Sequence, residues 1–89
     1  MSVLIANKNY LKMNKNFLKI FGERLKGLRL EQNLSQVDLA YKGKFDRNYI
    51  GMLERGERNP SLKNLKRLAD ALEITLPELL NFEQNDKCK

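Results

Sequence analysis

The sequence SQVDLAYKGKFDRNYIGMLERGER, residues 35–58, decides the fold. Its apolar residues recur at helical spacing in two sets, with a break at Gly43 and Lys44 between them. Ser35 precedes the first set and Asp46 stands near the start of the second, where a side-chain oxygen can cap the first amides of a helix. The pattern therefore predicts a helix, a tight turn and a second helix.

The second predicted helix leaves polar residues on its outer side. Phe45, Ile50 and Leu53 are expected to face inward, because they share one helical stripe. The residues on the outer side or its margins are Arg47, Asn48, Gly51, Met52 and Arg55. Such a surface contributes little to folding, so we expect it to carry the function.

These residues resemble the Cro/repressor-like (XRE) helix-turn-helix family, whose second motif helix enters the major groove of DNA. The likeness runs from about Phe17 to Leu80. Its ordered motifs are LSQ at 34–36, LA at 39–40, YI at 49–50, ERG at 54–56 and NPSL at 59–62. It implies an all-α, compact five-helix, lambda-repressor-like DNA-binding domain. The DRNYI and ERGERN segments are similar to the controller proteins of restriction-modification systems.

Composition further limits the classes of function that the chain can have. The chain has 89 residues, enough for one domain with a modest core. Lys and Arg number 17 against 11 Asp and Glu, and the net charge of +6 favours polyanionic partners. With no His and one Cys, at position 88, we expect no internal disulfide, metal site, cofactor or catalytic residue, and a cytoplasmic location.

Three parts are expected along the chain. Residues 1–15 form an N-terminal extension, residues 16–82 the helix-turn-helix domain and residues 83–89 a polar tail. The extension is either mobile or an arm that pairs with a partner subunit or lies on DNA. Its apolar run is too short to cross a membrane. Asn16 is expected to cap the first helix of the domain.

Helical spacing also predicts the other inward stripes. In the first helix the stripe is Phe17, Ile20, Phe21, Leu25 and Leu28. In the fourth it is Leu62, Leu65, Leu68, Ala69 and Leu72. Lys63, Lys66 and Arg67 lie off this stripe. Lys66 and Arg67 are expected on a solvated face, and Lys63 is the exception because it follows the loop that grips the DNA backbone in the family. Gly22 and Gly27 weaken the first helix, so close packing against a neighbour is expected at both. Asn33 and Gly56 are expected to end helices, and Ser61 and Thr75 to cap them.

Arg29 falls near the inner stripe, where a charge needs a partner. In the family that the chain resembles, an Arg and a Glu at matching positions form a buried or half-buried ion pair, which implies a pair between Arg29 and Glu54. The alternative is that both are ordinary surface charges.

The turn departs from the family's pattern. Lys44 holds the position that is usually Gly or Asn, and Gly43 comes one residue earlier. Either Lys44 adopts a left-handed conformation or the turn is shifted.

DNA-contacting roles are carried over from the family residue by residue. Arg47 is the first candidate to read a base, because a guanidinium can bond both acceptors of guanine. Asn48 is the second, and Gln36 is expected to bond a phosphate or a neighbouring base. The expected DNA-backbone contacts are Ser35, Lys42, Lys44, Tyr49, Arg55, Arg58, Asn59 and Lys63. For each residue the alternative is an ordinary solvated side chain.

A short helix over residues 76–82 supplies apolar surface near the C-terminus. The family commonly forms a two-fold dimer there, so the expected interface residues are Ile74, Leu76, Leu79, Leu80 and Phe82. Simple closure of the core is the alternative. A homodimer would require a near-palindromic operator.

The predicted function is therefore a transcriptional regulator that binds double-stranded DNA. A restriction-modification controller would regulate its own gene and an endonuclease gene, with RNA polymerase as a further contact. No membrane and no small-molecule ligand are expected. The open alternatives are a phage-type repressor, an antitoxin that also binds a toxin, and a protein-interaction module with the same fold. An enzyme is not expected.

Overall fold

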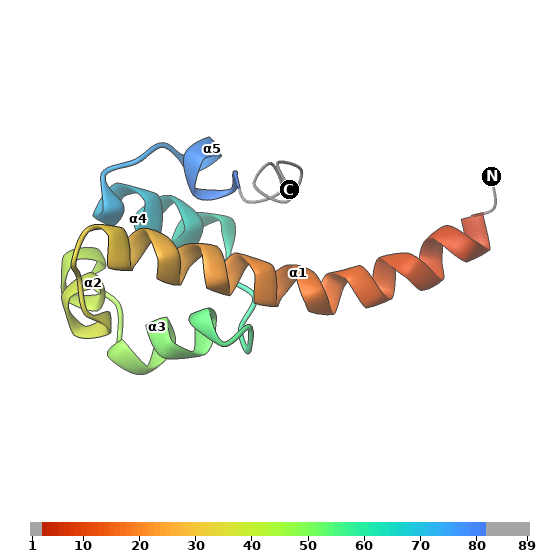
Figure 1. The fold of residues 1–89 in the computed structure, drawn as a ribbon, viewed down its shortest axis with the longest axis horizontal. Helices are drawn as coiled ribbons and strands as arrows, with labels where there is room; N and C mark the ends of the chain where they lie inside the picture. Colours follow the sequence, from red (N-terminus) through yellow and green to blue (C-terminus); the bar gives the residue numbers. More distant parts are fainter. Residues whose placement is uncertain (1–2, 82–89) are drawn as a thin grey trace.

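Five α-helices and no strand occur between residues 3 and 81. The computed structural model describes the backbone of residues 3–81 and the side chains of residues 17–81. The helices are α1 (Val3–Glu31), α2 (Gln36–Gly43), α3 (Arg47–Glu54), α4 (Leu62–Leu72) and α5 (Leu76–Leu79) (Figure 1). The predicted all-α, five-helix fold is confirmed.

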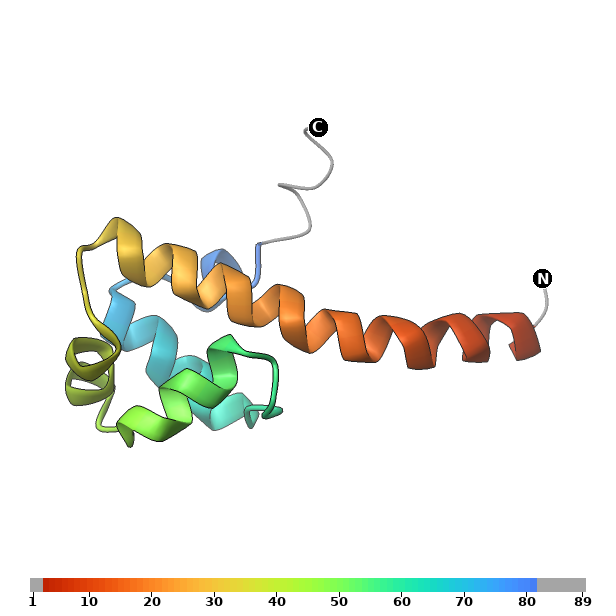
Figure 2. The same cartoon turned by 60° about the horizontal axis from the view of Figure 1, so that its bottom comes forward.

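Helix α1 is longer than the sequence predicted. It begins at Val3, so Asn16 lies inside the helix and the prediction that Asn16 caps it is wrong. The preceding residues contain neither Gly nor Pro, so no strong helix breaker separates them from the rest of α1. Figure 2 shows the N-terminal half of α1 projecting away from the other helices. A domain boundary after residue 15 stays a prediction.

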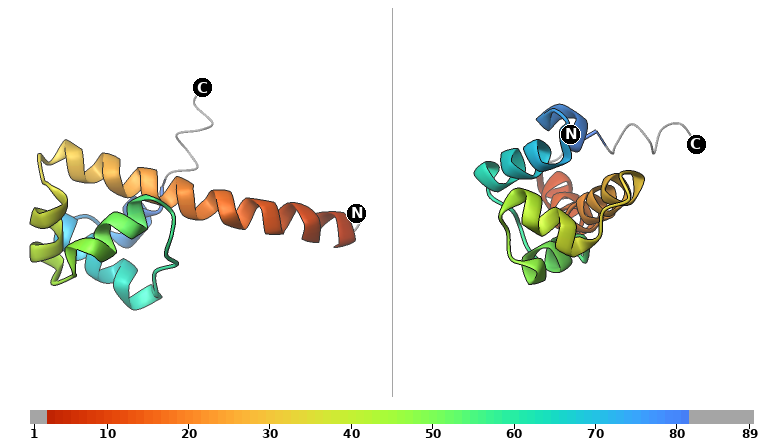
Figure 3. Two further views of the ribbon diagram at one scale, coloured as in Figure 1. Left: turned by 90° about the horizontal axis from the view of Figure 1, so that it is seen from below. Right: turned by 90° about the vertical axis from the view of Figure 1, so that its left-hand side faces the viewer.

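The core lies around the C-terminal half of α1 (Figure 3). All five helices contribute to it, and the largest fully buried side chains are Leu25, Leu39, Ile50, Leu53, Leu68, Leu72 and Leu79. Burying a side chain of this size stabilises the fold by about 1.5–3 kcal/mol. The core therefore fixes α2 and α3 against α1 and α4.

The predicted stripe of α4 is correct except at its first residue. Leu68, Ala69 and Leu72 are buried, whereas Leu62 is 72% exposed. Leu62 directly follows the cap Ser61, and the buried part of the stripe begins one turn later. The prediction for Leu62 is therefore wrong.

Capping residues account for most helix ends. The Ser61 hydroxyl accepts a hydrogen bond from the amide of Asn64, as predicted. Thr75 and Glu78 form a capping box at α5, which stops at Leu79 rather than continuing to residue 82. Asn33 and Gly56 have positive φ angles of 59° and 77°, as expected of residues that end helices. Residues 82–89, including Phe82 and the predicted tail, lie outside the described part.

The two glycines of α1 differ. A Cβ atom on Gly22 would lie 2.5 Å from the backbone oxygens of Leu53 and Glu54, so α1 and α3 cross closely here, as predicted. A Cβ on Gly27 would meet nothing within 4 Å. The packing argument is therefore wrong for Gly27, because that residue faces open space.

Candidate nucleic-acid interface

Helix α2 begins with a reciprocal cap. The Ser35 hydroxyl accepts a hydrogen bond from the Asp38 amide at 2.9 Å, and the Ser35 amide donates to Asp38 Oδ2 at 2.8 Å. These bonds to the charged carboxylate lower the pKa of Asp38. The cap fixes the entry to α2, and the Ser35 hydroxyl keeps its own hydrogen for a further acceptor such as a phosphate.

The turn between α2 and α3 is built on Lys44. Lys44 adopts a left-handed conformation with φ 59° and ψ 47°, which settles the choice between a left-handed Lys44 and a shifted turn. Gly43 remains in α2 and is buried against the Phe45 ring. A Cβ atom at this position would lie 2.6 Å from that ring, so a side chain here would require the ring to move. The left-handed residue is therefore the lysine, despite the cost to a side chain with a Cβ.

Arg67 of α4 holds this turn in place. Its Nη2 donates to the carbonyl oxygens of Gly43 at 2.8 Å and Lys44 at 2.6 Å. Its guanidinium also stacks 4.1 Å from the centroid of the Phe45 ring. The prediction that Arg67 belongs to a solvated face is therefore wrong. Helical spacing placed it off the apolar stripe, and only the folded turn brings acceptors to it.

Helix α3 presents its predicted outer face except at Gly51. Arg47 and Asn48 are exposed, and Ile50 and Leu53 are buried, as expected. Gly51 is buried, because the side chains of Gln36 and Arg55 lie over it. Asp46 occupies the N-cap position, but its side chain makes no capping hydrogen bond. The prediction of a side-chain cap at Asp46 is therefore wrong.

Three candidate base readers meet in one place. A surface hollow of about 300 Å³ lies between the start of α2 and the outer side of α3. The residues that line it are Gln36, Arg47, Asn48, Gly51, Met52 and Arg55. The hollow thus unites residues that are up to 19 positions apart in the sequence, from 36 to 55.

A buried ion pair lies behind this hollow. Arg29 Nε and Nη2 donate to the two carboxylate oxygens of Glu54 at 2.6 and 3.0 Å, and both residues are buried. Arg29 Nη1 also donates to the Leu34 carbonyl at 2.8 Å. The ion pair that the family resemblance implied is present. Gln36 Nε2 donates to Glu54 Oε1 at 3.1 Å, so the same carboxylate orients the Gln36 amide.

Tyr49 belongs to an aromatic and polar cluster beside the turn. Its ring stacks on Phe45 with centroids 5.5 Å apart, and its hydroxyl accepts a hydrogen bond from Asn64 Nδ2 at 2.9 Å. The Arg58 guanidinium lies 5.6 Å from the Tyr49 centroid. The hydroxyl hydrogen of Tyr49 therefore points away from Asn64. Sequence reasoning missed Asn64, because nothing in its spacing pairs it with Tyr49.

The other predicted backbone contacts lie on the surface. Lys44, Arg58, Asn59 and Lys63 are exposed. Lys42 is exposed and forms an ion pair with Glu73 at 3.4 Å. Arg55 pairs with Glu57 at 3.0 Å. A DNA contact at any of these positions stays a prediction.

The predicted dimer residues do not share one surface. Leu79 is fully buried in the core of the single chain, so its assignment to an interface is wrong. It packs inward because α5 closes the core over α4. Ile74 and Leu76 are half-buried, and Leu80 is 37% exposed. These three keep surface that a second chain can cover.

None of the helices within residues 3–81 is long and apolar enough to cross a membrane. Within the part of the chain that the structure describes, no group of three or more His, Cys, Asp or Glu side chains is placed to hold a metal ion.

Comparison with known proteins gives consistent matches. A family described as Helix-turn-helix matches residues 25–79. The control protein C.BamHI of Bacillus amyloliquefaciens is 36% identical, over 86% of this chain and 96% of its own length. The control protein C.MunI of Mycoplasma sp is 46% identical, over 74% of this chain and 92% of its own.

Two solved structures similar to this chain are also those of controller proteins. The restriction-modification controller protein C.AhdI from Aeromonas hydrophila is 50% identical with a TM-score of 0.69, covering 70% of this chain and 94% of its own. The controller protein C.Esp1396I is 33% identical with a TM-score of 0.73, covering 82% of this chain and 96% of its own. That protein was crystallised as a tetramer in complex with its natural 35 base-pair operator.

Proposed function

We propose that this chain, which belongs to the helix-turn-helix family of DNA-binding transcriptional regulators, binds operator DNA as the controller of a restriction-modification system. The observation that carries the proposal is the hollow where Gln36, Arg47 and Asn48 come together on α2 and α3. The helix-turn-helix motif presents this surface to the major groove. Similarity to control proteins along most of their length supports the controller role.

Base reading falls to the start of α3. Arg47 is the first residue of α3 and is exposed, and its side chain makes no hydrogen bond or ion pair within residues 17–81. A free guanidinium can donate to both O6 and N7 of guanine, which discriminates against a wrong base by about 1–3 kcal/mol. Asn48 follows it and suits the N6 and N7 atoms of adenine. The N-terminal residues of a recognition helix are those that contact base edges.

Phosphate contacts fix the register on the duplex without reading sequence. Lys44, Arg58, Asn59 and Lys63 are exposed and supply donors for them. The hydroxyls of Ser35 and Tyr49 have their acceptor side occupied within the protein, which leaves each a hydrogen to donate to phosphate. The net charge of +6 favours the same partner.

The binding unit is a homodimer. Leu80 is partly exposed and Ile74 and Leu76 are half-buried at the α5 end of the domain, so a two-fold contact there would cover apolar surface. It would place two copies of α3 about 34 Å apart, one turn of DNA, on a near-palindromic operator. The tetrameric operator complex of the related C.Esp1396I supports a multimeric binding unit.

Regulation follows from where the operator lies. In the controller role the protein acts in the cytoplasm on its own promoter and on that of an endonuclease gene. Binding at one site blocks RNA polymerase, and binding at an adjacent site recruits it through a direct contact.

Binding of the purified protein to the DNA upstream of its own gene tests this proposal. We expect two chains per near-palindromic site, much tighter binding than to random DNA, and an affinity that falls steeply with salt because counterions are released. If the protein binds this DNA no more tightly than random DNA, the proposal that it controls its own promoter is contradicted. If only one chain binds per site, the proposal of a dimeric binding unit is contradicted.

A further inference from the structure

Arg55 and Glu57 form a two-pronged ion pair at the C-terminal end of α3. Arg55 Nε donates to Glu57 Oε2 at 3.0 Å, and Arg55 Nη2 donates to Glu57 Oε1 at 3.1 Å. The pair is exposed, with 60% and 52% of the two side chains accessible to solvent. Exposed pairs contribute little to stability, so folding does not explain this geometry.

The Arg55 guanidinium lies over the recognition face rather than at its edge. A Cβ atom on Gly51, one turn earlier in α3, would be 3.3 Å from Arg55 Nη1 and 3.7 Å from Gln36 Oε1. Because Gly51 has no side chain, the guanidinium occupies the space above its backbone. Arg55 therefore lines the same hollow as Arg47 and Asn48.

The ion pair leaves one edge of the guanidinium available. Glu57 engages the side formed by Nε and Nη2. The outer edge retains both hydrogens of Nη1 and one of Nη2, since a guanidinium carries five. This pair of nitrogens matches the O6 and N7 acceptors of guanine.

We propose that Arg55 reads a guanine in the major groove and that Glu57 is the positioning residue that orients it. The inference rests on the proposed function and revises the sequence-based assignment of Arg55 to the DNA backbone. A phosphate contact needs only positive charge, and the neighbouring carboxylate reduces that charge. A guanidinium that reads a base needs a fixed orientation, and the bidentate ion pair with the Glu57 carboxylate supplies it.

The test uses half-sites selected by the wild-type protein from random double-stranded DNA. Each G·C pair of the selected site is then replaced in turn, and the affinity ratio between original and replaced DNA is measured. We expect Arg55→Ala to lower this ratio about tenfold or more at one G·C pair of each half-site and to spare the ratio at the others. Glu57→Gln should lower the ratio at the same pair.

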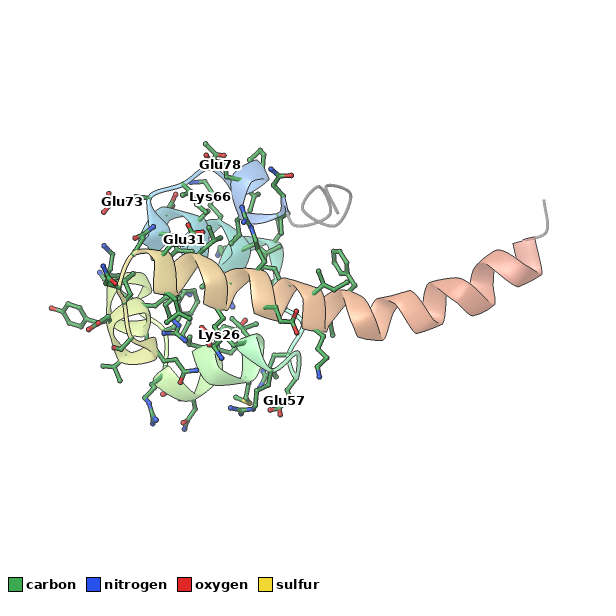
Figure 4. The ribbon with its side chains drawn as sticks, in the orientation of Figure 1. Lys26, Glu31, Glu57, Lys66, Glu73 and Glu78 are labelled. Carbon is green, nitrogen blue, oxygen red and sulfur yellow. The ribbon has the colours of Figure 1, made fainter. Side chains whose placement is uncertain are left out.

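Asp70→Asn is the matched control for Glu57→Gln. Asp70 forms an exposed ion pair with Lys66 at 2.7 Å, so its replacement also removes one carboxylate charge from a surface pair. Figure 4 shows Lys66 and Glu57 on opposite sides of α1. Asp70→Asn should raise affinity for all DNA slightly and leave every ratio unchanged.

Four outcomes would overturn the inference. Arg55→Ala could weaken binding to the original and the replaced DNA equally. It could also reduce the steepness with which the logarithm of the affinity falls with the logarithm of the salt concentration, by about 0.9. These results would identify a phosphate contact. Glu57→Gln could leave every affinity ratio unchanged, as Asp70→Asn is expected to do. Glu57 would then not orient Arg55. A wild-type protein that selects no preferred site would remove the proposed function together with this inference. If Arg47→Ala loses discrimination while Arg55→Ala keeps it, only this inference fails.

Discussion

Arg29 and Glu54 carry opposite charges into the interior and place them behind the surface hollow between α2 and α3. Each Glu54 oxygen accepts from the Arg29 guanidinium, and Glu54 Oε1 also accepts from Gln36. The pair therefore joins α1 to α3 and also sets the Gln36 amide. A buried pair of this kind adds little over an apolar pair, but losing one partner leaves a buried charge unpaired.

Arg29→Ala is expected to lower the free energy of unfolding by about 3–5 kcal/mol, because it leaves the Glu54 carboxylate buried without its cation. Urea unfolding of the purified protein measures this. Lys66→Ala is the control, since the Lys66–Asp70 pair is exposed and its loss should cost less than about 1 kcal/mol. A loss below about half a kcal/mol for Arg29→Ala would contradict a structural role for the pair.

Residue roles were predictable where the pattern is local or shared with a family. The Ser35 cap and the Arg29–Glu54 pair are of this kind. The role of Arg67 was not predictable, because its acceptors are carbonyl oxygens of Gly43 and Lys44, more than 20 positions away. The same holds for Asn64 and Tyr49, which meet only after α4 packs beside the turn.

At the scale of elements, α3 depends on its crossing with α1. Helical spacing gave the inward residues of both helices except Phe17, which is 44% exposed, so its assignment to the inward stripe is wrong. It did not give the distance between the two helix axes. That distance is set at Gly22, where the backbone of α3 leaves no room for a side chain. The start of α1 was mispredicted, because Asn16 can cap a helix but can also lie within one.

Gly22→Ala and Gly27→Ala should change stability in opposite directions. At Gly22 a methyl group would lie 2.5 Å from two backbone oxygens, so α1 must move and we expect a loss of about 1–3 kcal/mol. At Gly27 the space is open, and Ala should add about 0.5–1 kcal/mol through helix propensity. Thermal unfolding of the two variants and of the wild-type protein measures both changes in stability. Equal shifts in both would contradict the close crossing of α1 and α3.

On the scale of the whole molecule, the sequence predicted the fold class, and the face expected to carry function stays a prediction. It did not separate core closure from dimer contact at the C-terminal end. Leu79 and Leu80 are adjacent and equally apolar, yet Leu79 is fully buried and Leu80 is 37% exposed. The angle at which α5 docks decides this, and no spacing rule in so short a helix gives that angle.

The central claim is that the outer face of α3 reads sequence while the surrounding cations hold phosphates. The most direct test compares Arg47→Ala with Lys63→Ala, which each remove one exposed positive charge. Affinity is measured for the selected operator and for random DNA at one salt concentration. We predict that Arg47→Ala lowers the ratio of these affinities about tenfold or more, and that Lys63→Ala weakens both equally. If Arg47→Ala also weakens both equally, α3 does not read sequence through Arg47 and the account is contradicted.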